Sequence, residues 1–106
     1  NLRKMKDPSW RVIFTIHYDV LRELCDLLLR FKQQKCSNHQ GVFAFIILHF
    51  KDLEFYWAFL EAIRTLRNKN KYLGEDVSLR LWQEAEMQFD VYILTVRKKI
   101  EELLRE

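Results

Sequence analysis

The feature that most constrains the fold of this chain is how rarely its backbone is interrupted. Its 106 residues include only two glycines and one proline, and tight turns depend heavily on these two residue types. A β architecture needs turns at short intervals, whereas long helices need few. Because 49% of the residues are hydrophobic, a disordered chain is excluded. We therefore expect an all-α protein, and its length allows one domain over residues 1–106.

Hydrophobic residues recur at steps of three and four, which predicts four helices. The first begins at Asp7-Pro8, because proline suits the first helical position. Ser37 or Asn38 can cap the second helix, whose body, Val42 to Phe50, is apolar on all sides. Asp52 is placed to cap the third. The fourth begins just after Gly74 and reaches the C-terminus. Its seam consists of Leu79, Trp82, Ala85, Phe89, Tyr92, Val96, Ile100 and Leu103. Short connections then favour an up-down-up-down four-helix bundle with long first and last helices.

The first helix has two hydrophobic faces, and one domain needs only one of them for its core. The seam that fits a bundle consists of Trp10, Phe14, His17, Leu21, Leu24, Leu28 and Phe31. A second stripe beside it consists of Ile13, Ile16, Val20 and Leu27. With fifteen aromatic residues in so small a protein, the interior cannot hold every large side chain. We expect a homodimer that forms through helix faces.

Composition and motifs also indicate the cellular location of the protein and the kinds of site that it can contain. The net charge of +3 and the pI of about 9.0 are mildly basic. The longest apolar run, GVFAFIILHF, is about half of what a membrane crossing needs, and Cys25 and Cys36 fit reduced thiols. We therefore expect a cytoplasmic protein without a membrane contact. The chain has no glycine-rich phosphate loop and no CxxC, HExxH or EF-hand motif, so we expect no metal and no cofactor.

The segment Ile63–Gly74 contains the strongest candidate site. Its cations, without any acid among them, are Arg64, Arg67, Lys69 and Lys71, and its other polar side chains include Asn68 and Tyr72. Cations near a helix C-terminus are stabilised by the helix dipole without any function, which accounts for the two lysines. Arg67 is different, because it continues the apolar stripe of the third helix and offers a planar fork for phosphate. The sequence leaves both interpretations open.

These residues resemble a known family. A four-helix bundle with an Arg-Asn pair late in its third helix, followed by histidine or tyrosine, a glycine-bearing turn and a long last helix, is typical of the HEPN domain. The stretch LRNKNKYLG is similar to that motif, and YDVLRELCDLLLRFKQQKCSNHQGVFAFI is similar to the family's first helix and the entry to its second. The likeness extends from about Tyr18 to the C-terminus.

The resemblance implies a homodimer in which two motif copies face each other across a cleft. Many HEPN domains are metal-independent ribonucleases with an arginine, four to six residues and a histidine. They serve in toxin–antitoxin and defence systems, and several pair with a nucleotidyltransferase. By this resemblance Arg67 matches the motif arginine, Asn68 its neighbour, and Tyr72 stands where the histidine belongs.

The replacement of the motif histidine by Tyr72 affects the expected activity, because an unperturbed phenol with a pKa of about 10 is a poor general base at neutral pH. Cleavage would need either a strongly lowered pKa of Tyr72 or a histidine such as His17 or His39 in the cleft. Spacing favours a His17 satisfied within the bundle, and it places His39 beside a helix start. The first hypothesis is a weakly catalytic or non-catalytic dimer that binds RNA or nucleotide phosphate through Arg67 and Asn68, with Arg64, Lys69 and Lys71 around them. The alternatives are an active endoribonuclease toxin that uses Arg67 and Tyr72, or an interaction module that partners a nucleotidyltransferase.

Overall fold

The computed structural model describes residues 6–69 and 75–106, with side chains for residues 10–68, 80 and 82–106. Within these ranges it contains four α-helices and one 3₁₀ turn, and no β-strand. The elements are α1 (Lys6–Phe31), α2 (His39–His49), η1 (Lys51–Leu53), α3 (Trp57–Lys69) and α4 (Glu75–Arg105). The prediction of an all-α protein is confirmed for this part of the chain.

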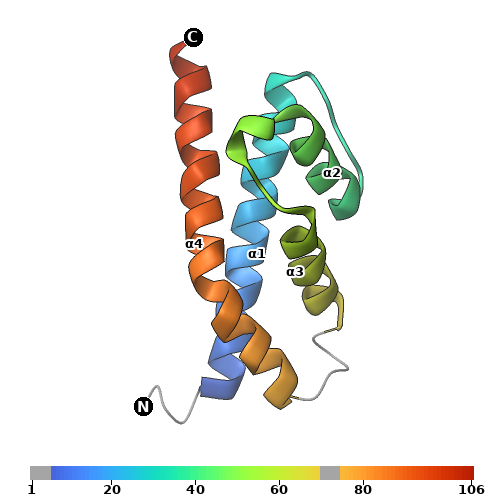
Figure 1. Ribbon diagram of the computed structural model, residues 1–106, viewed down its shortest axis with the longest axis vertical. Helices are drawn as coiled ribbons and strands as arrows, with labels where there is room; N and C mark the ends of the chain where they lie inside the picture. The colour runs from blue at the N-terminus through green and yellow to red at the C-terminus, as the bar shows by residue number, and fades with distance from the viewer. Residues whose placement is uncertain (1–5, 70–74) are drawn as a thin grey trace.

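The first and last helices are the long ones, as predicted, and they lie against each other (Figure 1). At about 1.5 Å per residue, the 31 residues of α4 account for the longest dimension of the molecule, 47 Å. The shorter helices α2 and α3 lie beside α1 (Figure 1). No helix in the described ranges is both long enough and apolar enough to cross a membrane.

The order of helix directions differs from the prediction. His39, at the start of α2, contacts Tyr18 in the middle of α1, whereas Phe50, just past the end of α2, contacts Lys32 just past the end of α1. Helix α2 therefore runs in the same direction as α1, and α4 does so too (Figure 1). Only α3 runs against them, so the up-down-up-down order is wrong. The cause is the connection 32–38, which returns along α1 before α2 begins.

The core is an aromatic and aliphatic cluster between the two long helices and the inner faces of α2 and α3. Phe14 of α1 lies edge-on to both Trp82 and Phe89 of α4, with ring centroids 6.0 and 5.7 Å apart. Most of the seam predicted for α4 is buried or packed on this cluster, including Trp82, Phe89, Tyr92 and Val96. On α1 the buried position is Tyr18 and not His17, which is only half-buried.

The connection between α2 and α3 also differs from the prediction. Asp52 lies in η1 and does not cap α3, because its carboxylate accepts a hydrogen bond of 2.9 Å from Lys99 Nζ of α4. This bond lowers the pKa of Asp52. Glu54 then takes a left-handed conformation with φ of 58°, and α3 begins at Trp57. The turn is therefore tied to α4 before the third helix starts.

Helix α2 begins at a tight cap. Asn38 has extended backbone angles, and its side-chain oxygen accepts a hydrogen bond of 2.7 Å from the Gly41 N–H, which is the N-cap arrangement predicted for Ser37 or Asn38. A side chain at residue 41 would collide with the sulfur of Cys36. The glycine thus lets the connection 32–38 pack directly against the first turn of α2.

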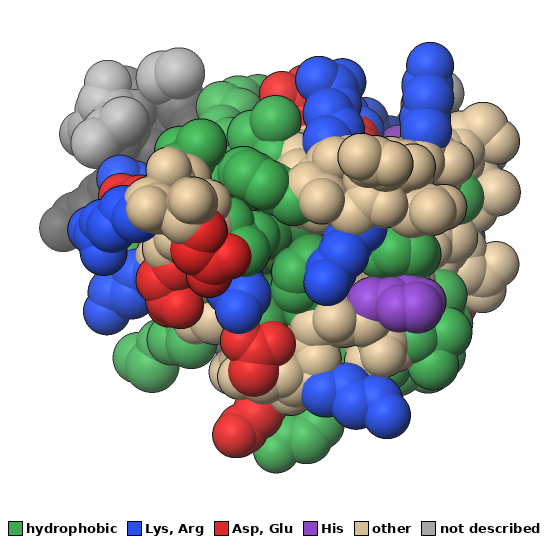
Figure 2. All heavy atoms as spheres, turned by 90° about the horizontal axis from the view of Figure 1, so that it is seen from above, with side chains coloured by type: hydrophobic (Ala, Val, Ile, Leu, Met, Phe, Trp, Pro, Cys, Tyr) green, Lys and Arg blue, Asp and Glu red, His purple; other side chains and the backbone are tan. Residues whose placement is uncertain are grey.

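Hydrophobic side chains also remain on the surface. Viewed from the end at which α4 finishes, they lie between charged groups in the middle of the molecule (Figure 2). The exposed hydrophobic side chains of the described residues include the second stripe of α1, since Ile13, Ile16, Val20 and Leu27 are each at least 41% exposed. Helix α2 also has an exposed side, although its sequence is apolar all round, because Leu48 is 63% exposed. One chain therefore leaves apolar surface uncovered on at least two helices.

Candidate functional site

The predicted site residues lie at the C-terminal end of α3, and the structure describes only some of them. Arg64, Arg67 and Asn68 are on the last turns of this helix, and Lys69 is its final residue, with its side chain outside the described residues. Lys71 and Tyr72 fall in the range 70–74, which is also outside the described residues. Asn68 is exposed to solvent. The site can therefore be built from Arg64 and Arg67.

Arg67 lies at the edge of the core and not within it. The buried positions of α3 are Leu60, Ile63 and Leu66, so the apolar stripe continues through Leu66. The Arg67 side chain is 36% exposed, and its guanidinium carbon lies 5.4 Å from the centre of the Tyr18 ring. That distance is within the range of a cation–π contact. Tyr18, on α1, thus gives the Arg67 guanidinium a cation–π contact.

The charge of Arg67 is only partly matched within the chain. Its Nε lies 3.5 Å from Asp19 Oδ1, and this nitrogen is shielded from solvent without a hydrogen-bond partner. A close guanidinium–carboxylate bond would measure about 2.8 Å, so the contact with Asp19 is long. Since Asp19 is itself 44% exposed, water weakens the attraction further. Arg67 keeps much of its positive potential at the surface.

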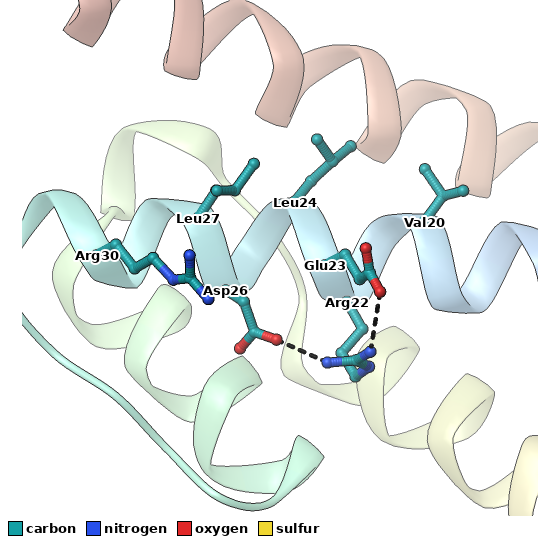
Figure 3. Close-up of a pocket in the computed structure, with 7 residues that line it drawn as sticks. All are labelled: Val20, Arg22, Glu23, Leu24, Asp26, Leu27 and Arg30. Carbon is teal, nitrogen blue, oxygen red and sulfur yellow. Dashed lines mark hydrogen bonds and ion pairs between the residues drawn. The ribbon is translucent and has the colours of Figure 1, made fainter.

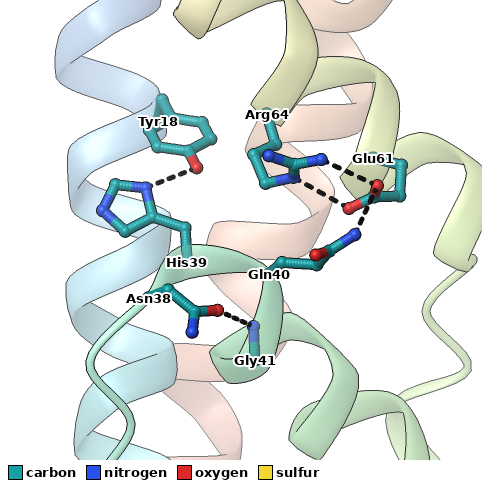
Figure 4. Close-up of polar contacts among 7 residues, drawn as sticks. All are labelled: Tyr18, Asn38, His39, Gln40, Gly41, Glu61 and Arg64. Carbon is teal, nitrogen blue, oxygen red and sulfur yellow. Dashed lines mark hydrogen bonds and ion pairs between the residues drawn. The ribbon is translucent and has the colours of Figure 1, made fainter.

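Tyr18 connects Arg67 to a histidine that lies far from it in the sequence. Its hydroxyl is 2.8 Å from His39 Nδ1, at the start of α2, and the two rings lie 5.5 Å apart. Figure 4 shows Tyr18, His39 and Arg64 where α1, the N-terminal end of α2 and α3 meet. Three helices therefore supply a phenol, an imidazole and two guanidinium groups to one region of the surface.

Two ionisation equilibria are shifted in this region. Burial raises the pKa of Tyr18 to about 12, against the opposing effect of Arg67 and Arg64. Burial also lowers the pKa of His39, and the charges of Arg22 and Arg67 lower it further. At neutral pH the phenol is therefore protonated and the imidazole is neutral. That pairing lets the hydroxyl donate to Nδ1 while the other ring nitrogen carries the proton.

Arg64 is held more firmly than Arg67. Its Nε donates to Glu61 Oε2 at 2.9 Å and its Nη2 to Glu61 Oε1 at 3.0 Å. Gln40 of α2 donates to the same carboxylate at 3.1 Å, as Figure 4 shows. These bonds lower the pKa of Glu61 and raise that of Arg64. Arg64 is thus held in place, but its charge is largely neutralised by Glu61. Arg67 is therefore the stronger candidate for binding an anion.

The other two histidines lie outside this region. His17 Nδ1–H donates a hydrogen bond of 2.8 Å to the Ile13 carbonyl oxygen, and the ring lies 3.4 Å from Asp90 of α4 and packs against Trp82. The prediction that His17 is satisfied within the bundle is confirmed. His49 is exposed at the end of α2 and stacks on Phe45. No group of three possible metal ligands occurs in the described part of the chain.

Sequence reasoning missed the contribution of α1 to the site. Tyr18 follows Phe14 by four residues, so helical spacing alone could have placed it on the buried face. Asp19 carries no such signal, because its role depends on where α3 packs. The sequence places His39 beside a helix start, and only the return of the connection 32–38 brings it to Tyr18.

A separate hollow lies on α1 (Figure 3). All the residues that line it come from that one helix: Val20, Arg22, Glu23, Leu24, Asp26, Leu27 and Arg30. It is therefore an uncovered part of the α1 surface and not an enclosed cavity. Arg22 is bound there to Asp26 at 2.6 Å, so its charge is matched. The hollow shows where α1 lacks a covering helix.

Comparison of the chain with protein-family models, curated proteins and solved structures finds no match. Function is therefore inferred from the side chains of the region described above.

Proposed function

We propose that this chain is a HEPN-like domain that forms a homodimer and binds a phosphate of RNA or of a nucleotide through Arg67, with weak cleavage or none. The observation that carries the proposal is the environment of Arg67. Its guanidinium lies on the ring of Tyr18 and has only a long contact with an exposed carboxylate. Such a group offers bidentate hydrogen bonds to phosphate at little cost in lost ion pairing.

The main experiment measures binding of a fluorescently labelled single-stranded RNA at several salt concentrations, with EDTA present. We expect affinity to fall steeply as salt rises, because phosphate contacts release counterions. Arg67→Ala should weaken binding by roughly tenfold or more, as for the loss of a charge-assisted hydrogen bond. It should also reduce the salt slope by about one.

Arg97→Ala is the matched control, since Arg97 is exposed on α4. It removes the same charge from the chain and should leave the affinity close to that of the original protein. If binding does not depend on salt, or if both alanine variants bind equally well, the proposal for Arg67 is wrong.

An active metal-independent endoribonuclease is the second candidate, and His39 is the observation that favours it. Tyr72 lies outside the described residues, but His39 supplies an imidazole to the region of Arg67 through Tyr18. Incubation of the purified protein with RNA and EDTA separates the two functions. Cleavage that disappears with Arg67→Ala would establish the endoribonuclease and overturn the non-catalytic proposal.

The exposed stripe on α1 supports the proposed homodimer. Ile13, Ile16, Val20 and Leu27 form it, and the hollow of Figure 3 overlaps its second half. Ile16 lies one helical turn from Asp19, the residue paired with Arg67. Two copies that pack through this stripe would therefore bring their Arg67 sites toward a common seam. The toxin–antitoxin or defence setting, and a nucleotidyltransferase partner, are proposed on the HEPN resemblance alone.

A further inference from the structure

His39 lies in a position that suits an anion for a reason independent of Arg67. It is the first residue of α2, a helix of 11 residues. The first N–H groups of a helix have no partner within it, and they point toward the solvent with a partial positive charge. The Asn38 side chain satisfies the N–H of Gly41, so the N–H groups of the two preceding residues are left for a ligand. Helix N-termini of this kind bind phosphate in many proteins.

The imidazole of His39 is held in one place. Its Nδ1 is bonded to the hydroxyl of Tyr18, and Tyr18 is fully buried. The Nε2 atom makes no hydrogen bond to any of the described residues. The ring is only half-buried, which leaves it accessible to a ligand. Tyr18 therefore acts as a positioning residue that leaves one ring nitrogen available.

The charges that face His39 come from two helices packed against α2. Helix α1 contributes Arg22, Asp19 and Asp26 as well as the neutral phenol of Tyr18, and α3 contributes Arg67. The combined effect lowers the pKa of His39, with burial as the largest cause. A phosphate beside the ring would act in the opposite direction, since a negative charge favours the imidazolium form.

We propose that His39 is a second phosphate-binding residue of this site. Its Nε2–H donates to an RNA phosphodiester bound between the N-terminus of α2 and Arg67, and its Nδ1 takes up one proton from solvent while the Tyr18 hydroxyl turns from donor to acceptor. This inference rests on the proposed function, because it needs RNA to bind at Arg67. His39 would be a phosphate-binding residue that lies outside the Arg-Asn motif of α3. By linkage, affinity rises as pH falls, and a single proton limits the rise to tenfold per pH unit.

The experiment uses a uridine oligonucleotide with a 5′-hydroxyl, because neither its phosphodiesters nor its bases titrate near neutral pH. Binding is measured from pH 5.5 to 8 at constant salt, for the original protein and for His39→Gln. We expect the affinity of the original protein to rise severalfold toward pH 5.5, and the His39→Gln profile to be flatter and to lie below it at acid pH. His49→Gln is the control, because it removes a histidine from the other end of the same helix.

A histidine NMR titration adds a direct measurement, in which the pKa of His39 should be higher with bound RNA than without it. If RNA binding depends on Arg67 but His39→Gln keeps the full pH dependence, the inference is wrong and the proposed function stands. The inference is also wrong if RNA leaves the His39 pKa unchanged. If RNA binding does not depend on Arg67 at all, both fail together.

Discussion

The hydroxyl of Tyr18 lies 2.8 Å from Nδ1 of His39, and this bond joins the middle of α1 to the first residue of α2. It fixes where α2 starts along α1, and with it the position of the imidazole relative to Arg67. Because burial raises the pKa of Tyr18 to about 12, the phenol stays protonated in the folded protein over the whole range in which His39 titrates.

The burial of Tyr18 predicts a loss of stability at alkaline pH. The pKa of Tyr18 is higher in the folded state than the ordinary value of 10.0, so its stabilisation is complete below pH 10 and is lost as pH rises toward 12. Tyr18→Phe should lower the free energy of unfolding by about 1 kcal/mol at pH 8. At pH 11 the difference should shrink or reverse, as measured by urea unfolding. Tyr56→Phe, at a site 68% exposed, should have little effect at either pH, and a Tyr18→Phe deficit that stays constant would contradict the prediction.

Arg67→Lys tests whether the shape of the guanidinium matters beyond its charge. Lysine keeps the positive charge but loses the planar fork and the contact of the guanidinium with the Tyr18 ring. RNA affinity should therefore fall by roughly fivefold, less than for alanine, while the salt slope stays the same because the charge is retained. Titration of labelled RNA at three salt concentrations measures both quantities. Equal binding by arginine and lysine would show that bidentate recognition is not used.

Gly41→Ala should destabilise the protein because of one neighbour. In an ordinary helix the alanine would be favourable by up to about 1 kcal/mol, but here its Cβ would meet the sulfur of Cys36. Crowding of this kind costs about 1–3 kcal/mol, so we expect a lower melting temperature in thermal unfolding followed by circular dichroism. In a Cys36→Ala background the same substitution should become neutral or stabilising. An equal cost in both backgrounds would show that the sulfur is not responsible.

Ile16→Glu should prevent the proposed dimer without unfolding the chain. Ile16 is 55% exposed within the α1 stripe, so a single chain tolerates a charge there, whereas a dimer would have to bury it unpaired. Sedimentation velocity should show a dimer for the original protein and a monomer for the variant. Leu48→Glu, which changes an exposed leucine of α2, should remain dimeric. A monomer already present for the original protein would refute the interface.

Local sequence patterns predicted the elements well because they depend on neighbours along the chain. The spacing of Phe89, Tyr92 and Val96 marked the buried face of α4, and Asn38 marked the start of α2. The same patterns failed at Asp52, whose carboxylate is bound by Lys99, forty-seven residues further along. A capping side chain and an ion-paired one look alike in the sequence, because the difference lies in what packs nearby.

The sequence by itself determined that the described chain is helical and that its first and last helices are long. It placed Arg67 on the apolar stripe of the third helix, whereas in the structure the stripe continues through Leu66 and Arg67 lies at the edge of the core. Scarce glycine and proline, helical spacing and side-chain chemistry are local properties, so they can be read without a fold. Only the tertiary structure decided that α2 runs parallel to α1, because the return of the connection 32–38 depends on packing against α1. That return brings His39 to Tyr18, and the packing of α3 brings Arg67 to the same ring. The candidate site is thus a product of the helix arrangement, which no local pattern encodes.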